Sequence, residues 1–182
     1  MQIITGKYRA RKLVSVPSAS TRPTLARVKE SIFNLIQDKI SGSVVLDLFA
    51  GSGAFGAECI SRAAKKVYFV DSSKSAVAAI KTNTKAMIED FEIINDDYMN
   101  ALSMFLHKGE KFDIVYLDPP YKSDFASKSM AILEKNNLLK DGATIVVEHA
   151  DKNDLQNLSK CYIIEKSKKY GIALVDIYTY RC

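Results

Sequence analysis

Histidine, cysteine and long apolar runs are all scarce in this chain of 182 residues. Because His107 and His149 are the only histidines, catalysis that relies on several of them is disfavoured. The cysteines, Cys59, Cys161 and Cys182, are odd in number and widely spaced. This pattern fits reduced thiols in a cytoplasmic protein and fits no zinc ribbon, so we expect no metal site.

The chain also lacks any stretch of 18 uncharged apolar residues, so we expect no membrane span. Residues 1–12 are basic but contain no apolar segment of the kind found in secretory signals. With 47% hydrophobic and 26% charged residues, the composition is typical of a globular protein, and the length suits one domain. No amphipathic stripe is left without a partner, so we expect a cytoplasmic monomer.

Positive charge is concentrated at the start of the chain. The formal net charge is +5, and residues 1–30 contain seven Lys or Arg residues against one acid, whereas residues 31–182 contain 19 basic and 20 acidic residues. Four of the six arginines lie in the first segment. The planar fork of arginine matches phosphate geometry, which favours a surface that faces a polyanion. On charge alone, a solvated arm without a partner is an equally good interpretation.

The order of apolar segments predicts an α/β fold. Residues 1–16 are expected to form a small hairpin or arm, residues 17–23 a loop, and Thr24 to about Lys39 a long amphipathic helix. Strands are then expected at 44–49, 67–70, 92–95, 114–117, 144–147, 162–165 and 173–180, and helices at 54–62, 74–87, 98–106, 126–135 and 152–158. Such repeated units predict a parallel sheet covered on both faces, with a closing antiparallel hairpin at one edge.

A glycine-rich turn, Gly51-Ser52-Gly53-Ala54-Phe55-Gly56, separates the first strand from its helix. It matches the pattern G-x-G-x-x-G, in which glycines let the backbone turn sharply and lie against a ligand. Asp71 lies 20 residues beyond Gly51 at the end of the next strand, where its carboxylate could accept both hydroxyls of a ribose. A tight turn followed by a solvated aspartate is the structural alternative.

Both NAD and S-adenosyl-L-methionine fit such a turn. Asp47 favours the second, because a dinucleotide-binding strand usually carries an apolar residue there, whereas a carboxylate can organise the ammonium end of an amino-acid ligand or the loop backbone. Asp96 and Asp97 end the third strand and could reach an adenine amine, and Asp97 is the preferred candidate.

The tetrapeptide Asp118-Pro119-Pro120-Tyr121 directly follows an apolar strand, at the edge where open α/β sheets bind ligands. A rigid strand-ending turn accounts for the prolines, but not for the acid and the aromatic residue on either side of them. The Asp118 carboxylate and the Pro119 carbonyl could accept the two N–H bonds of a nucleobase amine and aim its lone pair at an electrophile. Tyr121 could stack on the base, which would have to be flipped out or unpaired.

Together with Thr21-Arg22-Pro23-Thr24, Arg27, Lys29, Glu30 and Phe33, these motifs resemble the bacterial 16S ribosomal RNA guanine-N2 methyltransferases, and the likeness extends from Gly6 to Gly171. The resemblance implies a Rossmann-like class I methyltransferase fold, with a seven-stranded, mostly parallel sheet whose last two strands are antiparallel. It implies S-adenosyl-L-methionine as methyl donor, S-adenosyl-L-homocysteine as product, and one guanine of 16S ribosomal RNA (guanine 966) as target, within the small ribosomal subunit or an assembly intermediate. Two departures are visible: Asp71 stands where Glu is usual, and Ala63 replaces a frequent Gly.

The resemblance also divides the chain into a basic arm and helix facing RNA (1–40) and a methyltransferase domain (41–182), which form one compact unit. The predicted site residues fall into three groups: a catalytic group, a donor-binding group and a phosphate-binding group. They are, respectively, Asp118, Pro119, Pro120 and Tyr121; Asp47, Phe49, Ala50, Gly51, Ser52, Gly53, Asp71 and Asp97; and Arg9, Arg11, Lys12, Arg22 and Arg27.

Four other functions remain open at this point. DNA adenine-N6 methylation uses the same Asp-Pro-Pro-Tyr chemistry, but those enzymes usually carry additional sequence for target recognition. Protein glutamine methylation typically has Asn in place of Asp118. A catalytically silent RNA-binding module is disfavoured by the intact Asp118 and glycine turn, and an NAD oxidoreductase is disfavoured by Asp47.

Overall fold

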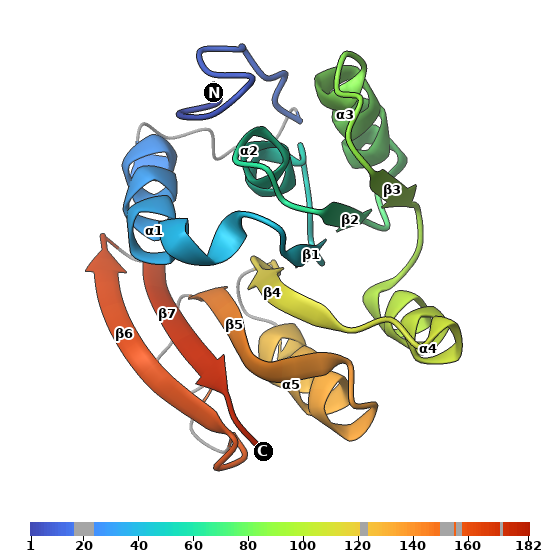
Figure 1. Ribbon diagram of the computed structural model, residues 1–182, viewed down its shortest axis with the longest axis vertical. Helices are drawn as coiled ribbons and strands as arrows, with labels where there is room; N and C mark the ends of the chain where they lie inside the picture. Colours follow the sequence, from blue (N-terminus) through green and yellow to red (C-terminus); the bar gives the residue numbers. More distant parts are fainter. Residues whose placement is uncertain (17–23, 121–123, 150–154, 156–157, 172) are drawn as a thin grey trace.

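The computed structural model describes residues 1–16, 24–120, 124–149, 155, 158–171 and 173–182, with only the backbone for 24–27. This part of the chain forms one seven-stranded sheet and five α-helices (Figure 1). The strands are β1 (Val44–Asp47), β2 (Lys66–Val70), β3 (Phe91–Ile94), β4 (Phe112–Leu117), β5 (Leu139–His149), β6 (Tyr162–Tyr170) and β7 (Ala173–Tyr180). The helices are α1 (Thr24–Ile40), α2 (Ala54–Ser61), α3 (Lys74–Thr84), α4 (Tyr98–Lys108) and α5 (Phe125–Lys135).

The strand order is β3-β2-β1-β4-β5-β7-β6. Every pairing from β3 to β5 is parallel, whereas β7 pairs antiparallel with both β5 and β6. The predicted α/β class is therefore confirmed, with a mostly parallel Rossmann-like sheet and a closing hairpin at one edge. β7 is the reversed strand of this hairpin, because β6 on its far side runs in the same direction as β5.

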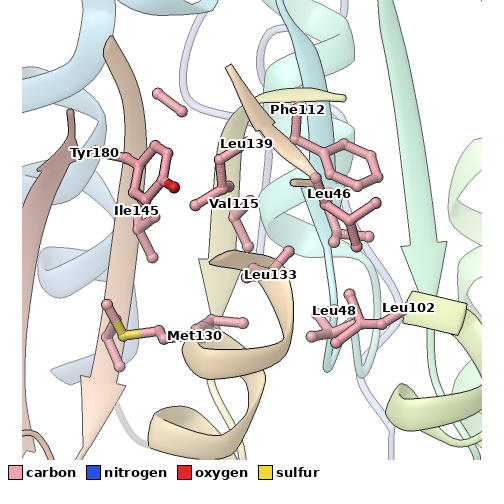
Figure 2. Close-up of a cluster of buried hydrophobic side chains, with 14 of the residues drawn as sticks. Leu46, Leu48, Leu102, Phe112, Val115, Met130, Leu133, Leu139, Ile145 and Tyr180 are labelled. Atoms are coloured by element: carbon pink, nitrogen blue, oxygen red, sulfur yellow. The ribbon is translucent and has the colours of Figure 1, made fainter. Parts of the chain in front are cut away.

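The two faces of the sheet bury separate apolar clusters. α1, α2 and α3 lie on one face, and α4 and α5 lie on the other (Figure 1). Figure 2 shows the second cluster, in which Met130 and Leu133 of α5 pack over Val115, Leu139 and other strand residues. Strands buried on both faces must be apolar at successive positions, which is the pattern from which the sequence predicted a parallel sheet.

Most elements lie where the apolar pattern predicts them, but several boundaries differ. β5 begins at Leu139, before an exposed polar stretch that hid the start of the strand, and α3 ends at Thr84 rather than at Met87. The expected loop at 17–23 lies outside the described residues, as does most of the expected helix at 152–158. Among the described helices, none combines the length and apolar character that crossing a bilayer requires.

The cysteines differ from the expectation of three thiols. Cys161 and Cys182 form a disulfide, with a Cα–Cα distance of 5.1 Å, whereas Cys59 is a free and buried thiol. The two partners lie 21 residues apart in sequence, but the β6–β7 hairpin brings its open ends together, and the Arg181 amide donates to the Cys161 carbonyl at 2.9 Å. The prediction was wrong for this pair because it used spacing along the chain rather than strand pairing.

The N-terminal arm, residues 1–16, is anchored to α2. Glu58 of α2 is fully buried, and its carboxylate accepts the backbone N–H groups of Ile4 (2.7 Å) and Thr5 (3.0 Å). The same carboxylate contacts two cations, Lys29 of α1 at 3.2 Å and Arg62 at 2.9 Å. Removing one partner of such a buried cluster leaves an uncompensated charge, so Glu58 fixes the arm, α1 and α2 relative to one another.

Gly6 makes a close backbone approach at the turn of this arm. Its φ of +89° lies in the left-handed region, and a Cβ there would stand 1.8 Å from the carbonyl oxygen of Ser61. The next two amides, of Lys7 and Tyr8, donate to the carbonyl and hydroxyl of Ser61 at 2.8 and 2.9 Å. Only glycine allows the arm to lie this close to the end of α2.

We therefore expect Gly6→Ala to destabilise the docked arm by about 2 kcal/mol or more, because steric overlap adds to backbone strain. Gly42→Ala is the matched control, since Gly42 also has a positive φ (+75°) but a Cβ there would meet nothing within 4 Å. Urea unfolding and hydrogen exchange at the amides of Lys7 and Tyr8 measure the difference. Equal losses in the two variants would show that the close contact does not matter.

Candidate active site

The candidate site lies at the carboxyl ends of β1, β4 and β5, which are neighbours in the sheet. The β1–β4 register pairs Asp47 with Tyr116, and the β4–β5 register pairs Leu117 with Val147. The residues that follow this last pair, Asp118 and Glu148, therefore occupy adjacent positions at the end of the sheet. Three carboxylates thus come from three neighbouring strand ends.

These side chains share the face covered by α1 and α2. Side chains alternate between the faces of a sheet. Leu46, Leu117 and Val147 belong to the cluster with α4 and α5, so their neighbours Asp47, Tyr116, Asp118 and Glu148 point to the opposite face. The Tyr116 ring stacks on Phe55 of α2, with ring centroids 4.0 Å apart and an interplanar angle of 4°, which fixes the floor of the site.

The glycine-rich turn is held from below by Asp71. One oxygen of its carboxylate accepts the Gly51 amide at 2.8 Å, and the other accepts the Ser73 amide at 2.8 Å. The predicted ribose ligand is therefore also the residue that orders the turn. Each carboxylate oxygen has a second lone pair, so ordering the turn leaves it able to accept a further hydrogen bond.

Asp47 is buried beneath the turn with one oxygen unsatisfied. Its Oδ2 accepts the Gly56 amide at 3.0 Å, whereas its Oδ1 is buried without a hydrogen-bond partner among the described residues. Burial raises the pKa of Asp47 to about 7, and the nearby Asp71 charge raises it further, against the Gly56 hydrogen bond and the Lys29 charge. A carboxyl group in this state is a strong acceptor for a ligand that brings a donor or a positive charge.

A pocket of about 160 Å³ opens above this turn. It brings together five of the predicted site residues with side chains that the sequence did not single out for the site. The predicted residues are Phe49, Ala50, Gly51, Ser52 and Asp118, and the additional ones are Met1, Lys29, Ile32, Ala54, Phe55, Tyr116 and Glu148.

The remaining predicted residues lie around this pocket or outside the described part. Gly53 and Pro119 are buried, and Pro120 is exposed. Asp97 is exposed at the start of α4, where its carboxylate accepts the Met99 amide at 2.8 Å, and Asp96 accepts the Asn100 side chain. Tyr121 and Arg22 lie outside the described residues, as does the side chain of Arg27.

Asp118 and Glu148 form an acidic pair inside the pocket. The Tyr116 hydroxyl donates to Oε1 of Glu148, whereas the Asp118 carboxylate has no hydrogen-bond partner in the part of the chain described. Burial raises the pKa of both acids, and the charge of Glu148 raises the pKa of Asp118 further. Two like charges at adjacent positions disfavour ionisation of both, so the pocket favours a ligand that donates hydrogen bonds to them.

A second pocket, of about 420 Å³, continues from the first along the arm. Met1 and Lys29 line both pockets, and Arg9 lines the second. Arg9 and Lys12 are exposed, and the Arg11 guanidinium lies 5.7 Å from the centre of the Tyr8 ring. The docked arm therefore places basic side chains beside the carboxylate-lined pocket.

Sequence reasoning missed Glu148 and Tyr116 as site residues. A usable signal existed for Glu148, because it ends an apolar strand in the way that Asp118 does. Tyr116 lies within an apolar strand, and nothing in its neighbourhood marked it as part of a site.

The raised pKa of Asp47 predicts a pH-dependent cost in stability. The folded protein keeps a proton up to about pH 7 that the unfolded chain releases near pH 3.8, so wild-type stability is reduced as the pH rises through this window. Asp47→Asn cannot ionise, so its stability relative to wild type should rise by a few kcal/mol between about pH 4 and 7 and then level off. Urea unfolding across this range measures the difference. Asp141→Asn, at an exposed position of β5, is the control, and parallel curves for Asp47→Asn and wild type would refute the assignment.

Comparisons with known proteins agree with this geometry. The family described as Conserved hypothetical protein 95 matches residues 1–179. Ribosomal RNA small subunit methyltransferase D of Haemophilus influenzae is 37% identical over 181 residues, which cover 98% of this chain and 93% of that protein. The structure of yhhF from Escherichia coli, assigned as a methyltransferase, has a TM-score of 0.88 at 29% identity, covering 100% of this chain and 98% of that chain.

A more distant structure, SMU.776 complexed with SAH, shares the fold alone, with a TM-score of 0.67 at 15% identity over 84% of this chain and 48% of that chain. The family match spans nearly the whole chain, and the site lies at the strand ends where this fold binds ligands. This chain is therefore a methyltransferase that depends on S-adenosyl-L-methionine, and it belongs to the Conserved hypothetical protein 95 family together with the ribosomal RNA small subunit methyltransferase D of Haemophilus influenzae.

Proposed function

We propose that this enzyme methylates the exocyclic N2 amine of a guanine in 16S ribosomal RNA, guanine 966 by family resemblance. The observation that carries the proposal is the unpaired Asp118 carboxylate, which lines a pocket beside the glycine turn and is followed directly by Pro119. The relatives named as methyltransferases of small-subunit ribosomal RNA support this substrate. The two open pockets along a basic arm support a polyanionic one.

The residues around the turn fit S-adenosyl-L-methionine. Asp47 has a buried and unpaired oxygen that suits an ammonium group, and a Cβ at Gly51 would meet no protein atom within 4 Å, so a ligand can approach the backbone there. We assign Asp71 to the ribose and Asp97 to the adenine amine, and we assign the wall of the site to Phe49, Ala50, Ser52 and Gly53. When bound, the donor supplies a methyl carbon whose bond to sulfur breaks as a nucleophile attacks, the electron pair remaining on sulfur.

Asp118 and Pro119 prepare the attacking nitrogen. The lone pair of a guanine amine is delocalised into the ring, which makes it a poor nucleophile. Hydrogen bonds from its two N–H groups to the Asp118 carboxylate and the Pro119 carbonyl hold the nitrogen closer to tetrahedral and direct its lone pair outwards. After the new N–C bond forms, the surplus N2 proton leaves to Asp118 or to water. The rigid prolines keep the two acceptors in place.

Access to the amine requires the guanine to leave its stack. Tyr121 provides an aromatic face for the extruded base, a contact worth about 1–3 kcal/mol. We assign Arg9, Arg11, Lys12, Arg22 and Arg27 to RNA phosphates, which position the substrate without reading its sequence. Site choice then depends on the shape of the RNA within the small subunit or an assembly intermediate. In this proposal the enzyme acts as a cytoplasmic monomer.

Replacing Asp118 tests the catalytic assignment. We expect Asp118→Ala to lower the rate of methyl transfer by about 10²–10⁴-fold, because N2 loses its charged acceptor, while donor affinity stays within a few-fold. Radiolabelled transfer to small subunits from a strain lacking this gene measures the rate, and calorimetry measures donor binding. Asp141→Ala is the control and should retain the wild-type rate. Near-wild-type transfer by Asp118→Ala would refute the acceptor role, and label mapped to adenine N6 of DNA instead would redirect the substrate assignment.

Replacing two arginines tests the arm. The double variant Arg9→Ala, Arg11→Ala should bind RNA more weakly and should reduce the slope of log K against log salt by about 1–2, since each phosphate contact contributes about 0.7–0.9 to it. Lys108→Ala with Lys111→Ala removes the same charge from exposed positions next to the amino end of β4. We expect that control to leave the slope unchanged. An equal slope in both double variants would mean that the arm is merely solvated.

A further inference from the structure

Glu148 is a buried acid for which the proposed transfer step has no use. Its residue is 4% exposed at the end of β5, and the Tyr116 hydroxyl donates to its Oε1. Within the described residues, its Oε2 has no hydrogen-bond partner. A buried carboxylate oxygen left without a partner is costly, so a group that donates a hydrogen bond to it is expected when the pocket is filled.

The sheet places this acceptor beside Asp118. Leu117 and Val147 are paired across β4 and β5, so the next residues, Asp118 and Glu148, stand side by side and face the same pocket. Tyr116 keeps Glu148 in position, because its own ring is stacked on Phe55. The pocket therefore offers two carboxylates at neighbouring fixed positions rather than one.

The Watson–Crick edge of guanine has matching neighbours. It carries N–H donors at N2 and at the adjacent N1, whereas a purine such as adenine or 2-aminopurine has a lone pair at N1. If N2 is held by Asp118 and Pro119, the N1–H is the next donor along the same edge. A carboxylate there accepts the N1–H of guanine and repels an N1 lone pair.

We propose that Glu148 is the residue that selects guanine, by accepting the N1–H of the base whose N2 is held at Asp118. This inference rests on the proposed function and adds a specificity-determining residue to it. The Tyr116 hydrogen bond lowers the pKa of Glu148 against the effect of burial, whereas the Glu148 charge raises the pKa of Asp118. Glu148 is thus the member of the pair better suited to carry the negative charge that accepts N1–H.

The test compares two target bases in one RNA. Small subunits are reconstituted with 16S RNA that carries either guanosine or 2-aminopurine riboside at the nucleotide that the wild-type enzyme methylates. Both bases present an N2 amine, but 2-aminopurine has an N1 lone pair. We expect wild type to prefer guanine by about tenfold to a hundredfold or more in kcat/KM.

Glu148→Gln keeps the size of the side chain and a partner for Tyr116, and it offers an amide N–H to the base. We expect this variant to lose activity on guanine and to gain activity on 2-aminopurine, so that the preference falls at least tenfold. Glu110→Gln is the matched control, because Glu110 also accepts a tyrosine hydroxyl, from Tyr68, but precedes β4 at the opposite edge of the sheet. It should leave both rates unchanged.

The possible outcomes separate this inference from the proposed function. If wild type does not methylate the guanosine subunits at N2, the proposed function fails and this inference fails with it. If wild type methylates guanosine but uses 2-aminopurine equally well, Glu148 does not select the base, whatever the variant does. If Glu148→Gln still binds the donor by calorimetry and keeps the wild-type preference, the inference is likewise overturned.

Discussion

The structure depends on one constraint, the parallel register of β1, β4 and β5. This register brings Asp47, Asp118 and Glu148 to adjacent strand ends, on the face covered by α1 and α2. Burying three acids so close together raises the pKa of each, and a fold stabilised only by its own contacts has no use for this arrangement. The strain is relieved when ligands bring positive charge and N–H donors, which is what a sulfonium amino acid and a guanine offer.

A second buried acid, Glu58, connects this site to the N-terminal arm. It binds the arm backbone and Lys29 at once, and Lys29 lines both the site pocket and the pocket beside Arg9. The arm is therefore attached by hydrogen bonds to the helix that begins at the glycine turn, rather than extending as a free tail. RNA held by the arm would lie next to the pocket that receives the base. The division of the chain at residue 40 into an arm and a methyltransferase domain stays a prediction.

The elements that the sequence predicted well are those with a strong local signal. α1 begins at Thr24 and ends at Ile40, as its apolar period indicates, and the strands before Gly51 and Asp118 are buried as expected. β5 was predicted too short because Lys140 and Asp141 are polar, although they continue a strand paired with β4. Such residues follow the ladder because of their neighbours in space, which a local pattern does not contain.

The sequence by itself determined the α/β class, the glycine turn after the first strand, and the placement of Asp118 at a strand end. These features follow from apolar periodicity, from glycine spacing and from the rule that parallel strands end at one edge. Only the tertiary structure decided that Glu148 stands beside Asp118, that Asp71 orders the turn, and that Cys161 meets Cys182. Each of these depends on register between segments at least 20 residues apart, which is set by packing across the whole sheet.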